Sequence, residues 1–144
     1  GVALNNNIAR RRYDTLCEAG YPEACGRLGN VYRDGKGVAQ SYNKAIELYE
    51  GACIAGAWDA CGELALLLHH GIGTQKDPAR SVELAQPACN HESAVSCYAL
   101  GLAYLEGAGV EANKNTAIGY LTEACRDYSQ EACMRLHRLG VKLH

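Results

Sequence analysis

The sequence contains no phenylalanine and only 3 prolines among its 144 residues. It also lacks an excess of charge of either sign, because 14 Lys and Arg residues face 16 Asp and Glu residues. This balance argues against the basic surface that binds nucleic acid or acidic lipids. No stretch approaches the roughly 18 consecutive apolar residues that a membrane-spanning helix needs. We therefore expect a partner other than nucleic acid, and no insertion into a membrane.

Other absences concern strands and processing signals. No segment alternates apolar and polar residues for long, so we expect no β-sheet. No secretion signal is visible at Gly1, so we expect any export signal to have been removed or left out of the sequence, and we expect a longer precursor. With 48% hydrophobic residues, the composition is that of a single folded domain.

Cysteine and glycine recur in the sequence with a fixed period. Each of the four C-x7-C pairs is followed by the next one after 36 residues, so that 144 residues make four periods. Leucine and glycine columns keep the same register, at Leu28, Leu64, Leu100, Leu136 and at Gly35, Gly71, Gly107. Such a period indicates a stacked array of small structural units. We expect four units in one solenoid domain, at residues 1–36, 37–72, 73–108 and 109–144.

Each unit reads as two antiparallel helices. One column holds residues whose side chains cap the start of a helix, namely Asn5, Ser41, Asp77 and Asn113. A second helix starts near Glu23 and its equivalents, with Ser93 and Ser129 as caps, and it ends at the glycine column of Gly35. Between the two helices stand Gly20, Gly56, Glu92 and Tyr128, so the last two corners must turn without glycine.

The cysteines allow three interpretations. If one helix continued through a pair, its two Cα atoms would lie about 12 Å apart, beyond the limit of about 7 Å for a disulfide. If the chain turns between them, they can face each other across a helix–helix corner, and we favour four such local disulfides. A metal site is disfavoured because C-x7-C pairs would not converge on one ion. Reactive free thiols are the third interpretation, against which the repetition speaks. Disulfides would imply an oxidising compartment, periplasmic or extracellular.

The repeated motif resembles the Sel1-like repeats, which are relatives of the tetratricopeptide repeats. The segment LGNVYRDGKGVAQSYNKA (residues 28–45) fits the pattern LG-x-x-Y-x-x-G-x-GV closely. The cysteine pair in every unit is similar to the cysteine-rich branch of the family, the Helicobacter cysteine-rich proteins. The resemblance implies an all-α, right-handed α/α solenoid with one disulfide per repeat, exported from a bacterium. The last unit departs from the pattern at residues 136–140, and we expect it to be a C-terminal cap.

Family members mostly bind proteins or peptides on a concave face, so the resemblance implies a non-catalytic adaptor. We expect a monomer that uses no cofactor and binds a protein or peptide along the free stripe of the second helices. That stripe is predicted to hold Arg27, Asn30, Arg33, Asp34, Glu63, Leu66, His69, His70, Tyr98, Leu102 and Leu105. The alternative for its leucines is that they pack against the adjoining repeat.

An enzymatic alternative is a penicillin-binding protein with weak β-lactamase activity, which some members of the cysteine-rich branch are described to have. Ser41 and Lys44 match the S-x-x-K pattern of such enzymes, but no K-T-G follows. Since Ser41 also stands in the cap column, we favour a structural role and assign no catalytic residue. His69 and His70 are adjacent and point about 100° apart on a helix, so we assign no metal ligand.

Overall fold

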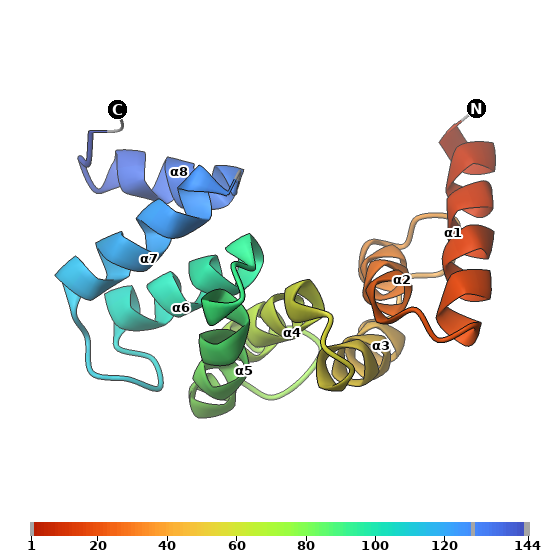
Figure 1. Cartoon of the computed structure of the whole chain (residues 1–144), viewed down its shortest axis with the longest axis horizontal. Helices are drawn as coiled ribbons and strands as arrows, with labels where there is room; N and C mark the ends of the chain where they lie inside the picture. The colour runs from red at the N-terminus through yellow and green to blue at the C-terminus, as the bar shows by residue number, and fades with distance from the viewer. Residues whose placement is uncertain (1, 128, 143–144) are drawn as a thin grey trace. The chain divides into compact units, whose positions relative to one another are not determined.

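The computed structural model describes residues 2–127 and 129–142, which form eight α-helices and no strand. They follow one another along the chain from red to blue in Figure 1. Their bounds are α1 Val2–Glu18, α2 Pro22–Asp34, α3 Tyr42–Ile54, α4 Trp58–His70, α5 Pro78–Asn90, α6 Ala94–Glu106, α7 Lys114–Arg126 and α8 Gln130–Arg138. The predicted all-α repeat fold is thus confirmed. No helix in the described part of the chain is both long and apolar enough to cross a membrane.

The helices form two compact units, an N-terminal unit of residues 1–61 and a C-terminal unit of residues 62–144. Helix α4 starts in the first and ends in the second. The division into four units of 36 residues stays a prediction. Within the C-terminal unit, the core gathers small and branched side chains from successive helices, among them Ala65, Ala85, Leu100, Leu121 and Leu136.

Side-chain caps start the first helix of three repeats, as predicted. Ser41, Asp77 and Asn113 each accept a hydrogen bond from the backbone N–H three residues later. The prediction for Asn5 is wrong, because Asn5 lies inside α1, which already begins at Val2. The reason is local. Glycines with positive φ stand before the other caps, at Gly35, Gly37, Gly71, Gly73, Gly107 and Gly109, whereas the described residues before Asn5, 2–4, are already helical and contain no glycine.

The corners between the two helices of each pair use a left-handed backbone. Gly20 and Gly56 have φ of 96° and 95°, a conformation that glycine adopts without steric cost. At the third corner Glu92 takes a φ of 65°. Among the residues that the structure describes, it is the one residue other than glycine with a positive φ. The prediction of a corner without glycine is therefore confirmed at Glu92, while Tyr128 lies outside the described residues.

Each corner is closed by a disulfide. The bonds join Cys17–Cys25, Cys53–Cys61, Cys89–Cys97 and Cys125–Cys133, with Cα–Cα distances of 4.6 to 4.8 Å. All eight cysteines are paired. The preferred interpretation of the cysteine pattern is thus confirmed, and four disulfides indicate an oxidising compartment.

Side-chain size is matched between each second helix and the first helix that follows it. A Cβ atom added to Gly29 of α2 would lie 2.6 Å from the ring of Tyr49 in α3, and one added to Gly101 of α6 would lie 2.8 Å from Leu121 in α7. At the same positions in α4 and α5 stand Ala65 and Ala85. Glycine thus stands opposite the large side chains of Tyr49 and Leu121. Where the first helix carries the small Ala85, the second helix carries alanine at the equivalent position.

Candidate functional site

Helices α4 and α6 lie side by side in the C-terminal unit and run in the same direction. Near their starts, Gly62 packs so closely on Val95 and Ser96 that an added Cβ would lie 2.5 to 2.7 Å from them. At their ends, His69 Nε2 lies 2.5 Å from Glu106 Oε2. Two neighbouring helices pinned at both ends present one continuous surface.

The free side of these helices carries a mixture of apolar and charged residues. On α4, Glu63, Leu66 and His70 are three and four residues apart and so share one side of the helix. On α6, Tyr98 and Leu105 are two turns apart, with Glu106 directly after Leu105. Leu66, Tyr98, Leu105 and Glu63 are half-buried, whereas His70 and Glu106 are exposed. We name this set the α4–α6 surface: Glu63, Leu66, His70, Tyr98, Leu105 and Glu106. The apolar members supply contact area, and the charged members form a polar border, a composition found at protein–protein interfaces.

Two residues predicted for the exposed stripe are buried, so their prediction as surface residues is wrong. Leu102 is 1% exposed and His69 is 3% exposed. The repeat explains Leu102, because its equivalent Asn30 in α2 accepts a 2.5 Å hydrogen bond from the buried Tyr49 of α3. In α2 and α6 this column therefore lies against the neighbouring structure rather than in solvent. Leu66 stands in the same column of α4 and is half-buried, with part of its side chain packed against the core.

His69 works as a tether between helices. Its Nδ1 is buried without a hydrogen-bond partner among the described residues. The contact of Nε2 with the Glu106 carboxylate joins α4 to α6. The carboxylate of Glu106 is about half exposed, so it stays available at the edge of the α4–α6 surface.

His70 stands in a cationic corner. Its ring meets that of His69 edge-on, with centroids 4.8 Å apart. Burial lowers the pKa of His70, the neighbouring His69, Lys76 and Arg135 lower it further, and Glu106 raises it. His70 therefore tends to be neutral near pH 7, and Arg135 brings a cation of α8 near the α4–α6 surface.

In the N-terminal unit, the predicted site residues of α2 have varied surroundings. Arg27 and Asp34 are exposed, and Asn30 is half-buried under its bond to Tyr49. Arg33 Nε donates to Asp34 Oδ1 at 3.0 Å. This hydrogen bond chiefly holds the pKa of the Asp34 carboxyl below its usual value. These residues lie on the surface of α2, and their role in binding stays a prediction.

The S-x-x-K residues have structural contacts. Ser41 accepts a hydrogen bond from the backbone N–H of Lys44 at 3.2 Å and so caps α3. The ammonium of Lys44 lies 5.0 Å from the centre of the Tyr32 ring, within range of a cation–π interaction. The preferred structural role of Ser41 is therefore observed directly.

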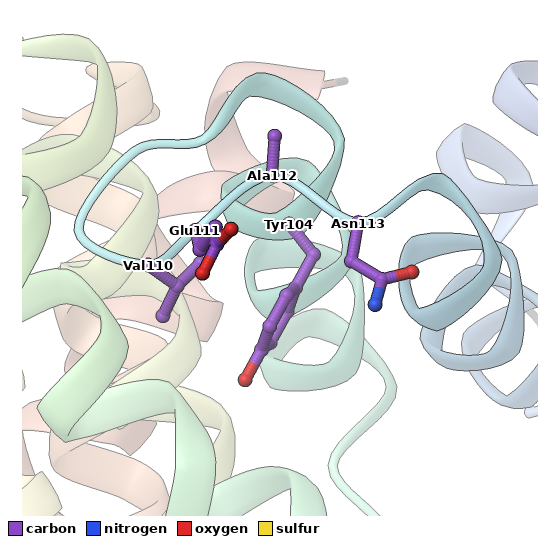
Figure 2. Close-up of a pocket in the computed structure, with 5 residues that line it drawn as sticks. All are labelled: Tyr104, Val110, Glu111, Ala112 and Asn113. Atoms are coloured by element: carbon purple, nitrogen blue, oxygen red, sulfur yellow. The ribbon is translucent and has the colours of Figure 1, made fainter.

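An open depression of about 500 Å³ lies beside the loop that follows α6. Figure 2 shows the ring of Tyr104 beneath the segment that carries Val110, Glu111, Ala112 and Asn113. Its polar groups serve the fold, because Asn113 Oδ1 caps α7 and Tyr104 O accepts from the backbone N–H of Asn113. Tyr104 also stacks on Tyr120, with ring centroids 5.6 Å apart. The depression thus has few groups left to orient a ligand.

One cluster among the described residues combines metal-ligand types, namely Cys89, Cys97 and Glu123. Both sulfurs are bonded to each other in a disulfide. Because thiolates bind metals and disulfide sulfurs do so poorly, the cluster is a covalent link beside an acidic side chain.

Sequence reasoning placed Glu106 on the exposed stripe of the second helices but did not predict its contact with His69, and it did not predict that Arg135 bears on His70. The sequence does hold a signal for Glu106. In an array with a period of 36, residues about one period apart sit on neighbouring equivalent helices, and Glu106 follows His69 by 37 positions. An acid at that distance from a histidine is a candidate for a pair between helices.

The comparisons with known proteins agree with this architecture. A Sel1 repeat protein from Oxalobacter formigenes is 27% identical, with a TM-score of 0.75 over 88% of this chain and 52% of its own. A protective antigen of uropathogenic Escherichia coli that displays an SLR fold is 30% identical, with a TM-score of 0.74 over 86% of this chain and 27% of its own. This chain thus spans about half and about a quarter of the two proteins. No curated protein matches the sequence.

The third structure is the cysteine-rich protein B of Helicobacter pylori, with 24% identity and a TM-score of 0.63 over 94% of this chain and 98% of its own. At that identity the likeness shows the fold alone. The Sel1 repeat family pattern matches residues 22–56, 58–93 and 94–129. With these boundaries each match runs from a second helix to the following first helix, and each disulfide crosses a boundary instead of lying within a repeat. The chain belongs to the Sel1 repeat family, whose solenoids are typically scaffolds for protein interactions.

Proposed function

We propose that this chain is a non-catalytic scaffold that binds an extended segment of a protein or peptide, in the periplasm or outside the cell. The α4–α6 surface is the proposed contact. Its main support is that half-buried apolar side chains remain on the free face of two helices that are pinned together at both ends. Rigid helices hold such side chains in place before binding, which lowers the entropy lost when a partner docks.

Leu66, Tyr98 and Leu105 are the proposed apolar contacts. All three are half-buried, so each offers a side chain that a partner can cover further. His70 and Glu106 border them with a ring that can donate hydrogen bonds and a carboxylate that accepts them. The expected ligand therefore carries apolar residues that meet the leucines and the tyrosine, with polar groups on either side of them.

A peptide library displayed on phage is a direct probe of this proposal. Peptides selected on the intact, oxidised chain are synthesised with a fluorescent label, and their Kd is measured by anisotropy. We expect enriched peptides with at least two apolar residues. Leu105→Glu and Leu66→Glu should each weaken binding about tenfold or more, since a charge would face the apolar side chains of the ligand.

Ile54→Glu is the matched control. Ile54 is 88% exposed at the end of α3 and is not part of the α4–α6 surface, so the Kd should not change with the same change of chemistry there. Circular dichroism checks that each variant stays folded. Failure to enrich any peptide, or equal affinity of all three variants for the selected peptides, would refute the proposal. Leu102 is unsuitable for this test because it is buried.

A further inference from the structure

The two disulfides that lie wholly in the C-terminal unit differ in how well they are shielded from solvent. Cys89 is 5% exposed and Cys97 is 1% exposed, and both belong to the hydrophobic core of that unit. Cys125 and Cys133 are both half-buried. A thiol that reduces a disulfide has to reach one of its two sulfur atoms. Cys125–Cys133 is therefore the more accessible bond of the two.

The shielded disulfide also has an acidic neighbour on helix α7. Glu123 Oε2 lies 4.0 Å from Cys89 Sγ, and a carboxylate oxygen of Glu123 lies within 4.8 Å of both sulfur atoms. In residues 2–127 and 129–142, such a group of two cysteine sulfurs and an acid occurs at this disulfide alone. The residues equivalent to Glu123 in the earlier first helices carry no charge: Thr15, Gly51 and Pro87.

Reduction by thiols would bring negative charge close to this carboxylate. An external thiolate attacks one sulfur of the disulfide, a new S–S bond forms as the old one breaks, and the second sulfur leaves as a thiolate. A second external thiol then attacks the mixed disulfide. Two external thiols thus become one external disulfide, and the protein gains two electrons and two protons as two thiols. The incoming and the leaving sulfur are both anionic, so a carboxylate a few ångströms away repels them.

We propose that Glu123 protects the Cys89–Cys97 disulfide from reduction by thiols, so that the C-terminal unit loses its two disulfides in a fixed order, with Cys125–Cys133 reduced first. Burial hinders the approach of the reductant, and the carboxylate slows the exchange itself. Both effects act on the same bond.

The protected bond ties the start of α6 to the end of α5. Tyr98 directly follows Cys97, and Leu105 and Glu106 lie further along the same helix. Conditions that reduce only Cys125–Cys133 therefore leave intact the link that holds α6, which carries half of the α4–α6 surface. This consequence for binding rests on the proposed function, whereas the order of reduction needs no ligand and is tested without one.

Timed reduction of the intact, oxidised chain tests the proposal. Samples are quenched with acid, their free thiols are alkylated, and mass spectrometry of the digested protein locates the alkylated cysteines. The reductants are two small thiols of similar size, 2-mercaptoethanesulfonate with a negative group and cysteamine with a positive one. We expect Cys125–Cys133 to be reduced about tenfold faster than Cys89–Cys97 by either thiol.

Glu123→Gln separates the charge from the burial. We expect it to speed the reduction of Cys89–Cys97 by 2-mercaptoethanesulfonate about threefold and the reduction by cysteamine much less, because repulsion grows with the charge of the reagent. A mere loss of stability would speed both reactions alike. Glu111→Gln is the matched control. It removes the same charge from the loop after α6, at the far end of that helix from Cys97, and should leave both rates unchanged.

The protection can also be transferred to another disulfide. Gly51 of α3 holds the position for Cys17–Cys25 that Glu123 holds for Cys89–Cys97, and a Cβ added to Gly51 would meet no atom within 4 Å. We expect Gly51→Glu to slow the reduction of Cys17–Cys25 by 2-mercaptoethanesulfonate about threefold relative to Gly51→Gln.

Three results would overturn the proposal. One is equal rates of reduction for Cys89–Cys97 and Cys125–Cys133. Another is an effect of Glu123→Gln that is the same with both thiols or is matched by Glu111→Gln. The third is equal rates for Cys17–Cys25 in the Gly51→Glu and Gly51→Gln variants.

Discussion

At the scale of single residues, the repeat allows one position to be compared under different side chains. The corner position is glycine at 20 and 56 but glutamate at 92, with φ positive in all three cases. The left-handed conformation costs an L-residue roughly 1 kcal/mol, and no such cost falls on glycine. The corner at Glu92 thus holds its shape against a small local strain, which the disulfide Cys89–Cys97 spans.

Replacement of Glu92 by glycine should therefore stabilise the chain. We expect Glu92→Gly to raise the free energy of unfolding by about 0.5–1 kcal/mol, because the strained backbone is relieved. Urea denaturation of the oxidised protein measures this change in the free energy of unfolding. Glu92→Ala is the control, since it removes the same side chain but keeps a Cβ. An increase of equal size in both variants would trace the effect to the side chain and contradict the backbone explanation.

The size-matched pairs are a second feature at this scale. Gly101→Ala would put a Cβ 2.8 Å from Leu121, so we expect it to destabilise the chain by about 1–3 kcal/mol through overpacking. In the background of Leu121→Ala, the same change recreates the Ala65–Ala85 pair and should cost much less. A double-mutant cycle, followed by thermal unfolding, measures this coupling. Additive effects would show that the two positions do not constrain each other.

At the scale of the helices, three caps with the same geometry start α3, α5 and α7, while the fourth predicted cap lies inside α1. Asp77 accepts from the backbone N–H of Arg80 at 3.1 Å. We expect Asp77→Ala to cost about 1 kcal/mol of stability. Asn5→Ala should be neutral or slightly stabilising, because alanine is the better residue in a helix interior. Chemical denaturation compares the two, and an equal loss would place the start of α1 at Asn5.

The sequence was sufficient to predict the helices and their corners for physical reasons. Caps, glycine stops and cysteine spacing are local signals, and Ser41 and Gly35 act through contacts within a few residues. The failure at Asn5 is local too, because a cap forms only where the preceding chain leaves the helix. No local signal says which neighbour covers a side chain. For this reason the predicted exposure of the stripe is seen at His70 but not at Leu102, which is buried.

At the scale of the whole molecule, covalent links recur at every corner. In the loop-entropy model, a disulfide that closes about nine residues contributes roughly 2–3 kcal/mol. We expect removal of the link by the double change Cys89→Ala and Cys97→Ala to lower the free energy of unfolding by about that amount. Thiol titration of the unfolded natural chain should find no free thiol before reduction and all eight after it. Free thiols in the unreduced protein would contradict the pairing and the oxidising compartment that it indicates.

The role of the molecule as a scaffold rests on where a ligand binds. The chain has a mass of 15.5 kDa, which suits backbone NMR, and a peptide selected from the library can be titrated into the labelled protein. We expect the largest chemical-shift changes at Leu66, His70, Tyr98, Leu105 and Glu106, on the α4–α6 surface. Saturating binding whose shift changes leave all five of these residues unaffected would contradict the proposed site.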